Sequence, residues 1–154
     1  IESVEAFTGP AYGVDLFKLE SPLPAPSVPE IGDADTQALF DALGRAAGRP
    51  WVMLSAGATK ADFTRVLQYA YAAGANGYLA GRAIWWDAFQ SFPDLDAMAE
   101  SLRGECLDYM HSINTLTDAE ATPWTAVVDA AGITGPYGEG EGFRAGYDGF
   151  GGGR

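Results

Sequence analysis

The 154-residue chain has one cysteine, few positive charges and no long apolar run. The single cysteine, Cys106, excludes a disulfide within the chain and fits a reducing compartment, so we predict a cytoplasmic protein. Lysine and arginine number 9 against 21 acidic residues, and the net charge of −12 argues against nucleic-acid partners and anionic membrane surfaces. No apolar run approaches the roughly 20 residues that cross a bilayer, and no signal peptide is visible.

The remaining composition is that of an ordinary globular domain. Hydrophobic residues make up 47% of the chain and charged residues 19%. The chain begins at Ile1 rather than methionine, and residues 1–8 resemble the end of a helix, so we expect an amino-terminal truncation. Glycine dominates residues 132–154. We therefore predict one domain over residues 1–131 and a flexible glycine-rich tail over 132–154 that carries no site.

Apolar residues follow two alternating periods along the chain. Short apolar runs predict buried strands at 14–22, 51–55 and 78–80. Helical spacing predicts helices at about 34–47, 60–73, 83–89 and 123–131. Strands that alternate with amphipathic helices are typical of parallel βαβ units with right-handed crossovers, so the predicted fold class is α/β. Three strands cannot close a barrel, and they fit either a small open sheet or the last part of a (β/α)₈ barrel.

A single long helix is predicted from Asp94 onward. Its apolar residues form one stripe, which consists of Leu95, Met98, Leu102, Cys106, Tyr109 and Ile113. We predict that Cys106 fills the core and that His111 lies at the surface. Neither residue has a second metal ligand or a nucleophile partner at a useful spacing.

Lys18 lies near the carboxyl end of the first predicted strand, which Pro22 stops. Alternation places Lys18 on the same face as Leu16 and Glu20. One interpretation is a lysine that extends into water or pairs with Glu20. The other is a desolvated amine with a lowered pKa, which attacks a carbonyl and forms a Schiff base. The strand alone does not decide between them.

The second and third strands are followed by residues suited to an anion. Ser55 and Gly57 follow the second strand, and Gly81 and Arg82 follow the third. Glycine lets backbone N–H groups approach an anion, and arginine offers a planar fork of donors. Each signal alone is common in ordinary turns, but parallel strands gather their carboxyl ends at one edge. Together with Lys18, these residues indicate a site for a phosphorylated carbonyl compound.

Three segments carry a resemblance to a known family: Asp15–Pro22, Trp51–Gly57 and Gly77–Trp85. They resemble the last three strands of class I tagatose-1,6-bisphosphate aldolases and the related sulfofructosephosphate aldolases. The resemblance covers about residues 1–125 and does not reach the glycine-rich tail. It implies a (β/α)₈ barrel of which this chain supplies the carboxy-terminal part, about strands 6–8.

The resemblance also implies roles for individual residues. Lys18 matches the catalytic Schiff-base lysine of the family, which uses no metal and no cofactor. The substrate-phosphate-binding residues would be Ser55, Gly57, Gly81 and Arg82. The family's acid/base glutamate belongs to an earlier strand that this chain lacks. Glu20 would tune Lys18 electrostatically and is not expected to shuttle protons.

The sequence therefore predicts a fragment of a class I aldolase, a lyase of carbohydrate metabolism. The parent enzyme would cleave a phosphorylated ketose, such as tagatose 1,6-bisphosphate or a sulfo-ketose phosphate, to dihydroxyacetone phosphate and an aldehyde. The fragment alone is expected to be inactive. The alternative is a non-catalytic phosphate-binding or interaction module in which Lys18 and Arg82 only hold a phosphate. The expected partner is a small phosphorylated sugar, and a homo-oligomer is compatible with the sequence.

Overall fold

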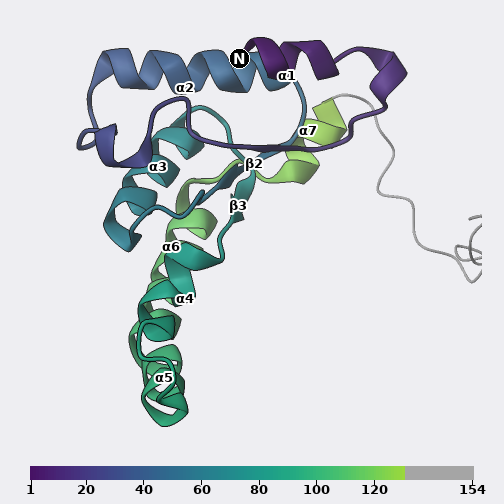
Figure 1. The fold of residues 1–154 in the computed structure, drawn as a ribbon. Coiled ribbons are helices and arrows are strands. Elements are labelled where there is room, and N and C mark those ends of the chain that lie inside the picture. Colours follow the sequence, from purple (N-terminus) through teal and green to yellow (C-terminus); the bar gives the residue numbers. More distant parts are fainter. Residues whose placement is uncertain (131–154) are drawn as a thin grey trace, which may run out of the picture.

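A computed structural model describes residues 1–130 of the chain (Figure 1). The predicted tail at 132–154 lies outside the described residues. The chain has the predicted order of alternating helices and strands, with short 3₁₀ turns at Pro10–Tyr12 and Ala25–Ser27. The helices and strands are α1 (Glu2–Phe7), β1 (Phe17–Leu19), α2 (Ala34–Ala47), β2 (Trp51–Leu54), α3 (Lys60–Ala72), β3 (Gly77–Leu79), α4 (Arg82–Phe89), α5 (Leu95–Ser101), α6 (Leu107–Glu120) and α7 (Trp124–Ala130).

The three strands form one parallel sheet in the order β1-β2-β3. Lys18 is paired with Val52, which in turn is paired with Gly77. This pairing confirms the predicted α/β fold class and the parallel arrangement. Because all three strands run in the same direction, their carboxyl ends lie at one edge of the sheet.

One face of the sheet is buried in the core and the other is open. On the buried face, Phe17 and Met53 lie in a core that also contains Phe40 of α2 and Phe63 of α3. On the opposite face Lys18 and Leu79 are exposed, Leu79 to 45%, and Val52 and Leu54 are partly buried. Figure 1 shows α2 and α3 beside the sheet, whereas α4 and α5 extend away from it. A parallel sheet is normally covered on both faces, so the open face is an unusual feature of the described residues.

Helices α2 and α3 begin and end within one residue of their predicted bounds. The Thr59 hydroxyl accepts a hydrogen bond from the Asp62 N–H and caps α3. The Asp33 carboxylate caps α2 in the same way by accepting from the Thr36 N–H at 2.8 Å. Helix α2 ends at Gly48, whose φ of 55° is the left-handed conformation that glycine adopts without strain. These local interactions fix the lengths of the two helices that cover the sheet.

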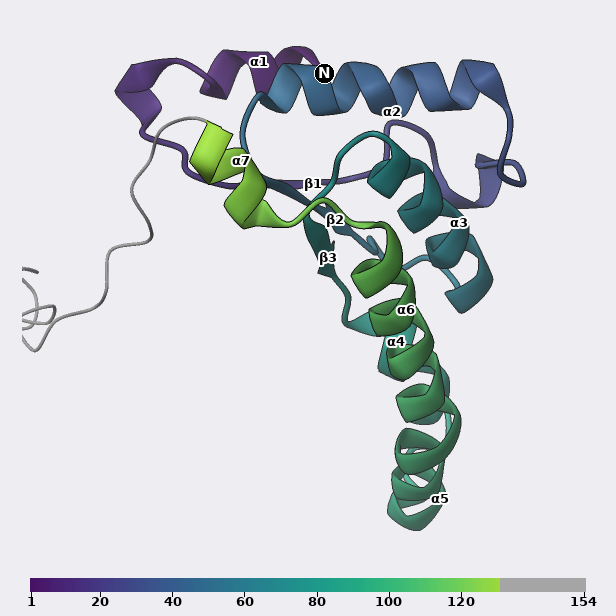
Figure 2. The same ribbon diagram turned by 180° about the vertical axis from the view of Figure 1, so that it is seen from behind.

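The prediction of one long helix from Asp94 onward is wrong. The segment divides into α5, a π-helical stretch at Leu102–Cys106 and α6, because Gly104 adopts non-helical dihedrals with φ −95° and ψ −107°. Because of this break, the predicted apolar stripe is not buried along its whole length. Leu95, at its start, is 66% exposed. Figure 2 shows α4, α5 and α6 forming a column that extends away from the sheet.

The predicted roles of the two residues on this segment are confirmed. Cys106 is buried, and His111 is exposed. Ile113 of α6 also belongs to the hydrophobic core, which anchors the near end of the column to the sheet-containing body.

Gly44 permits the close contact between α2 and the end of α3. A Cβ atom at Gly44 would lie 2.6 Å from the Ala73 carbonyl oxygen and 3.5 Å from the Trp51 ring. In an open helix, glycine to alanine stabilises by about 1 kcal/mol. Here we expect Gly44→Ala to lower the free energy of unfolding by roughly 1–3 kcal/mol, because the added methyl group overpacks the interface. Urea unfolding measures the change, and an unchanged or raised midpoint would contradict the contact.

Tyr71 provides a test of the contact between α3 and α6. Its buried hydroxyl forms a hydrogen bond with the Thr117 hydroxyl at 2.7 Å. Burial raises the pKa of Tyr71 to about 12, although the Thr117 hydrogen bond acts in the opposite direction. The unfolded chain loses this proton near pH 10 while the folded chain retains it, so this contribution to stability is complete below about pH 10 and is lost between pH 10 and about 12.

We therefore expect Tyr71→Phe to reduce the loss of thermal stability between pH 10 and pH 12. Tyr12→Phe is the control, because Tyr12 is exposed. Melting temperatures across this pH range measure both variants. Equal slopes for the two variants would show that Tyr71 is not the group responsible.

Candidate active site

The ends of β2 and β3 are joined directly at the edge of the sheet. The Ser55 N–H donates to the Leu79 carbonyl at 3.1 Å, and the Ala58 N–H donates back to the Ser55 carbonyl at 2.8 Å. Ala56 and Gly57 between them both have positive φ values, 48° and 81°. This tight left-handed turn leads straight into α3. It holds the Ser55–Gly57 turn against the end of β3.

Arg82 lies over Gly57. A Cβ atom at Gly57 would be 3.1 Å from both the Cζ and Nη2 atoms of Arg82, so the guanidinium occupies the space that a side chain would need. Arg82 is the first residue of α4 and is exposed. Within residues 1–130 it makes no ion pair. The structure thus brings together Ser55, Gly57 and Arg82, three of the residues predicted to bind an anion.

Gly81 was predicted to bind an anion, but in the structure it contacts the first turn of α4. Its carbonyl accepts hydrogen bonds from the Ile84 and Trp85 N–H groups at the start of α4. A Cβ atom at Gly81 would lie 3.4 Å from Nε1 of Trp85. The indole ring of Trp85 therefore lies against the backbone of Gly81. Sequence reasoning assigned no role to Trp85, because a tryptophan on a short helix carries no local signal for a site.

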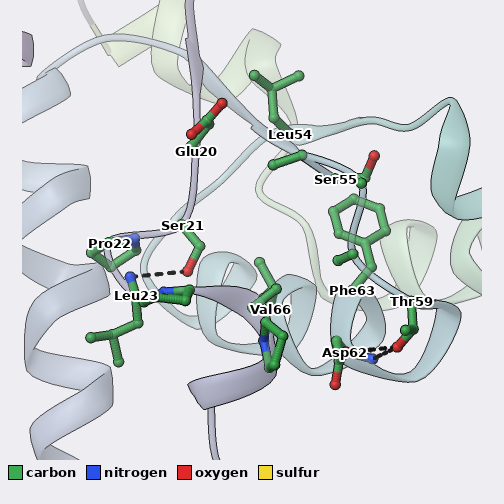
Figure 3. A pocket seen from close by; sticks show the side chains of 16 residues that line it. Glu20, Ser21, Pro22, Leu23, Leu54, Ser55, Thr59, Asp62, Phe63 and Val66 are labelled. Carbon is green, nitrogen blue, oxygen red and sulfur yellow. Dashed lines mark hydrogen bonds between the residues drawn. The ribbon is translucent and has the colours of Figure 1, made fainter.

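A cavity of about 530 Å³ opens beside this cluster, between the segment after β1 and the turn after β2 (Figure 3). Glu20, Ser21 and Leu23 form one side, and Ser55, Thr59 and Phe63 form the other. Asp62, at its base, accepts hydrogen bonds from the Thr59 hydroxyl and from Arg65. The cavity places the Ser55–Gly57 turn opposite the segment that follows Lys18.

The segment that closes this cavity is more ordered than its prolines indicate. It contains four prolines between residues 22 and 29, yet Ala25–Ser27 forms a 3₁₀ turn and Val28 is buried. The Tyr69 hydroxyl fastens the segment by donating to the Glu30 carbonyl at 2.7 Å and accepting from the Asp33 N–H at 3.1 Å. These contacts to α3 explain how a proline-rich loop holds a fixed cavity wall.

Lys18 lies outside the cavity that contains Ser55. It lines a second hollow of about 820 Å³ between α1, α2 and β1. Glu20, Ser21 and Pro22 border both hollows and therefore separate Lys18 from the Ser55–Gly57 turn. Lys18 is exposed, on the open face of the sheet. The described residues do not supply the desolvation that one interpretation of Lys18 requires.

Lys60 is the other lysine of the chain, and it has a structural partner. Its ammonium lies 3.0 Å from the Asp87 carboxylate of α4. Burial acts to lower the pKa of Lys60, but the hydrogen bond and charge of Asp87 outweigh it, so the pKa is raised. Lys60 is therefore a charged lysine that links α3 to α4, and it is not suited to attack a carbonyl.

Residues 1–130 contain neither a candidate metal site nor a candidate membrane span. No group of three or more His, Cys, Asp and Glu side chains in this range is arranged to hold a metal ion. None of the helices in the same range combines the length and apolar character of a membrane span.

The fold and the strand-end cluster define an α/β protein with its candidate site at the carboxyl edge of a parallel sheet. The sequence model of the DeoC/LacD family aldolase matches residues 6–87, a stretch that contains all three strands and every predicted site residue. The chain belongs to this aldolase family.

Curated relatives agree with this assignment. The chain is 30% identical to a tagatose 1,6-diphosphate aldolase of Lactococcus lactis subsp. lactis, over 81% of this chain and 42% of the relative. It is 31% identical to the tagatose 1,6-diphosphate aldolase of Listeria monocytogenes serotype 4a (strain HCC23), over 79% and 39%. For tagatose 1,6-diphosphate aldolase 2 of Enterococcus faecalis the identity is 30%, over 82% and 42%. The chain thus spans about two fifths of the length of the curated relatives it matches.

Gly57 allows the position of Arg82 to be tested. We expect Gly57→Ala to destabilise the chain by about 1–2 kcal/mol, because alanine is strained at positive φ, and also to displace the guanidinium. Gly74→Ala is the matched control, since Gly74 has a φ of 89° but no atom within 4 Å of an added Cβ. Both variants should lose similar stability, and only Gly57→Ala should weaken binding of inorganic phosphate in a calorimetric titration. If Gly57→Ala and Gly74→Ala bound phosphate equally well, the proposed role of the Arg82 guanidinium over Gly57 would be wrong.

Proposed function

We propose that the chain is the carboxy-terminal part of a class I aldolase and supplies about strands 6–8 of a (β/α)₈ barrel. The support is its parallel three-stranded sheet, whose open face would be the barrel interior. Leu16, just before β1, is 50% exposed on the side of the sheet that further strands would enclose. Enclosure by those strands would also remove Lys18 from water, which the described residues alone do not do.

The observation that carries the proposal is the placement of Lys18 on β1, beside the strands that hold the anion cluster. In the proposed reaction the neutral Lys18 amine attacks the ketone carbon of a phosphorylated ketose. Loss of water gives a protonated imine, which accepts the electron pair of the adjacent carbon–carbon bond as that bond breaks. The aldehyde leaves, the enamine takes up a proton, and water releases dihydroxyacetone phosphate from Lys18.

This chemistry needs a group that removes the hydroxyl proton of the departing aldehyde. We propose that the group lies on an earlier strand of the barrel, as the family pattern implies. Glu20 is exposed and borders the Lys18 hollow. We assign it an electrostatic effect on Lys18 and no part in proton transfer.

The phosphate of the substrate would be held at the strand ends. Arg82 offers a guanidinium fork that makes no ion pair within residues 1–130, and the Ser55 hydroxyl borders the adjoining cavity. Neither Ala56 nor Gly57 donates its backbone N–H to another group of residues 1–130. These two N–H groups, in successive residues with positive φ, are suited to bind an oxyanion. Tagatose 1,6-bisphosphate is the proposed substrate, and a sulfo-ketose phosphate is the second possibility.

A second candidate function is a non-catalytic phosphate-binding or interaction module. The exposure of Lys18 and its separation from the Ser55 cavity favour this alternative. In such a module Arg82 and the Ser55–Gly57 turn would bind phosphate, and Lys18 would never form an imine.

The two functions differ in what happens at Lys18. The chain would be produced together with the amino-terminal part of the Lactococcus lactis relative, then treated with dihydroxyacetone phosphate and sodium borohydride. We expect irreversible labelling at Lys18, located by peptide mass spectrometry. Lys18→Arg should abolish the label, and Lys60→Arg, which changes the other lysine, should retain it. The chain alone should remain unlabelled, because Lys18 stays in water.

Saturable phosphate binding without labelling at Lys18 would reject the aldolase and favour the binding module. Labelling that persists in Lys18→Arg would also reject the proposed role of this residue.

A further inference from the structure

Helix α4 carries two nitrogen donors to the edge of the sheet. Arg82 and Trp85 are three residues apart and so lie on neighbouring positions of one helix face. The Arg82 guanidinium lies over Gly57 at the end of β2, while Nε1 of Trp85 lies against Gly81 at the end of β3. The two donors therefore flank the edge at which the anion cluster was found.

The indole N–H of Trp85 is available for a ligand. The side chain is 39% exposed, and within residues 1–130 its N–H donates to no other group. An indole N–H donates and does not accept, so its partner must be an acceptor such as an oxyanion oxygen. The two donors lie at the carboxyl ends of neighbouring strands, an arrangement that suits two oxygens of one tetrahedral group.

The ring is held in place by its neighbours. The centroid of the Trp85 ring lies 6.0 Å from that of Trp86 and 6.0 Å from that of Phe89, with an edge-on arrangement to Phe89. Nε1 of the ring also lies against Gly81. A donor that is already oriented loses little conformational freedom on binding, which favours affinity.

We propose that Trp85 is a substrate-binding residue that donates its indole N–H to the phosphate held by Arg82. The proposal rests on the proposed function of this site and extends it, because neither the sequence pattern nor the family assignment gives Trp85 a role. Arg82 supplies charge and Trp85 a neutral, directional hydrogen bond. The pair selects a tetrahedral oxyanion over a planar carboxylate, whose two oxygens the guanidinium alone would satisfy.

The test observes the indole N–H directly. The whole chain, labelled with ¹⁵N, contains four tryptophans and gives four indole cross-peaks, of which Trp85→Phe removes one. Titration with inorganic phosphate should move the Trp85 cross-peak and leave that of the buried Trp51 in place. Acetate at the same ionic strength should move it much less. A Trp85 cross-peak that does not respond to phosphate would overturn the proposal.

Affinity measurements give a second readout. Trp85→Phe keeps an aromatic ring and removes the donor, so we expect phosphate to bind about five- to tenfold more weakly, the loss of one hydrogen bond. Trp124→Phe is the control, because Trp124 of α7 is 43% exposed and belongs to no part of the proposed site, so it should leave the affinity unchanged. Equal affinities for wild type and Trp85→Phe would overturn the proposal.

Failure of this inference can be told apart from failure of the proposed function. If Arg82→Gln abolishes phosphate binding but Trp85→Phe does not weaken it, the anion site stands and the role of Trp85 falls. If phosphate moves the Trp85 cross-peak but borohydride never labels Lys18 in the complemented protein, the role of Trp85 stands and the aldolase falls.

Discussion

Parallel pairing of three short strands is the constraint on which the candidate site depends. A parallel sheet places every carboxyl end at the same edge, and each following helix must begin there. The hydrogen bond from the Ser55 N–H to the Leu79 carbonyl continues the pairing past the end of β2. It fixes the turn at Gly57 against the start of α4. This register is what brings the Arg82 guanidinium over Gly57.

Close packing of the helices also fixes the loops that border the candidate site. Gly44 lets α2 approach the end of α3, and the Tyr69 hydroxyl fastens the proline-rich segment to α3. The ion pair between Lys60 and Asp87 links α3 to α4, the two helices that follow β2 and β3. The cluster at the sheet edge is therefore supported from the helical side by buried packing and specific polar contacts, which suits a site that must keep its geometry.

The open face of the sheet leaves Lys18 in water, whereas an imine-forming lysine needs a dry environment to be neutral. The chain spans about two fifths of its curated relatives. Further strands over the open face would enclose Lys18. Within residues 1–130, Ser55, Gly57 and Arg82 of the proposed anion site lie together, whereas Lys18, the proposed nucleophile, lies in water.

The sequence by itself determined the order of helices and strands, the parallel sheet and the family, because these depend on local periodicity, capping residues such as Thr59 and short motifs. It also predicted that Ser55, Gly57 and Arg82 would meet, since strand direction alone brings them to one edge. Only the tertiary structure decided that Gly104 breaks the long helix, that Gly81 accommodates Trp85, and that Lys18 is separated from the Ser55 cavity. Those features depend on contacts and burial between residues far apart in the chain, which no local pattern records.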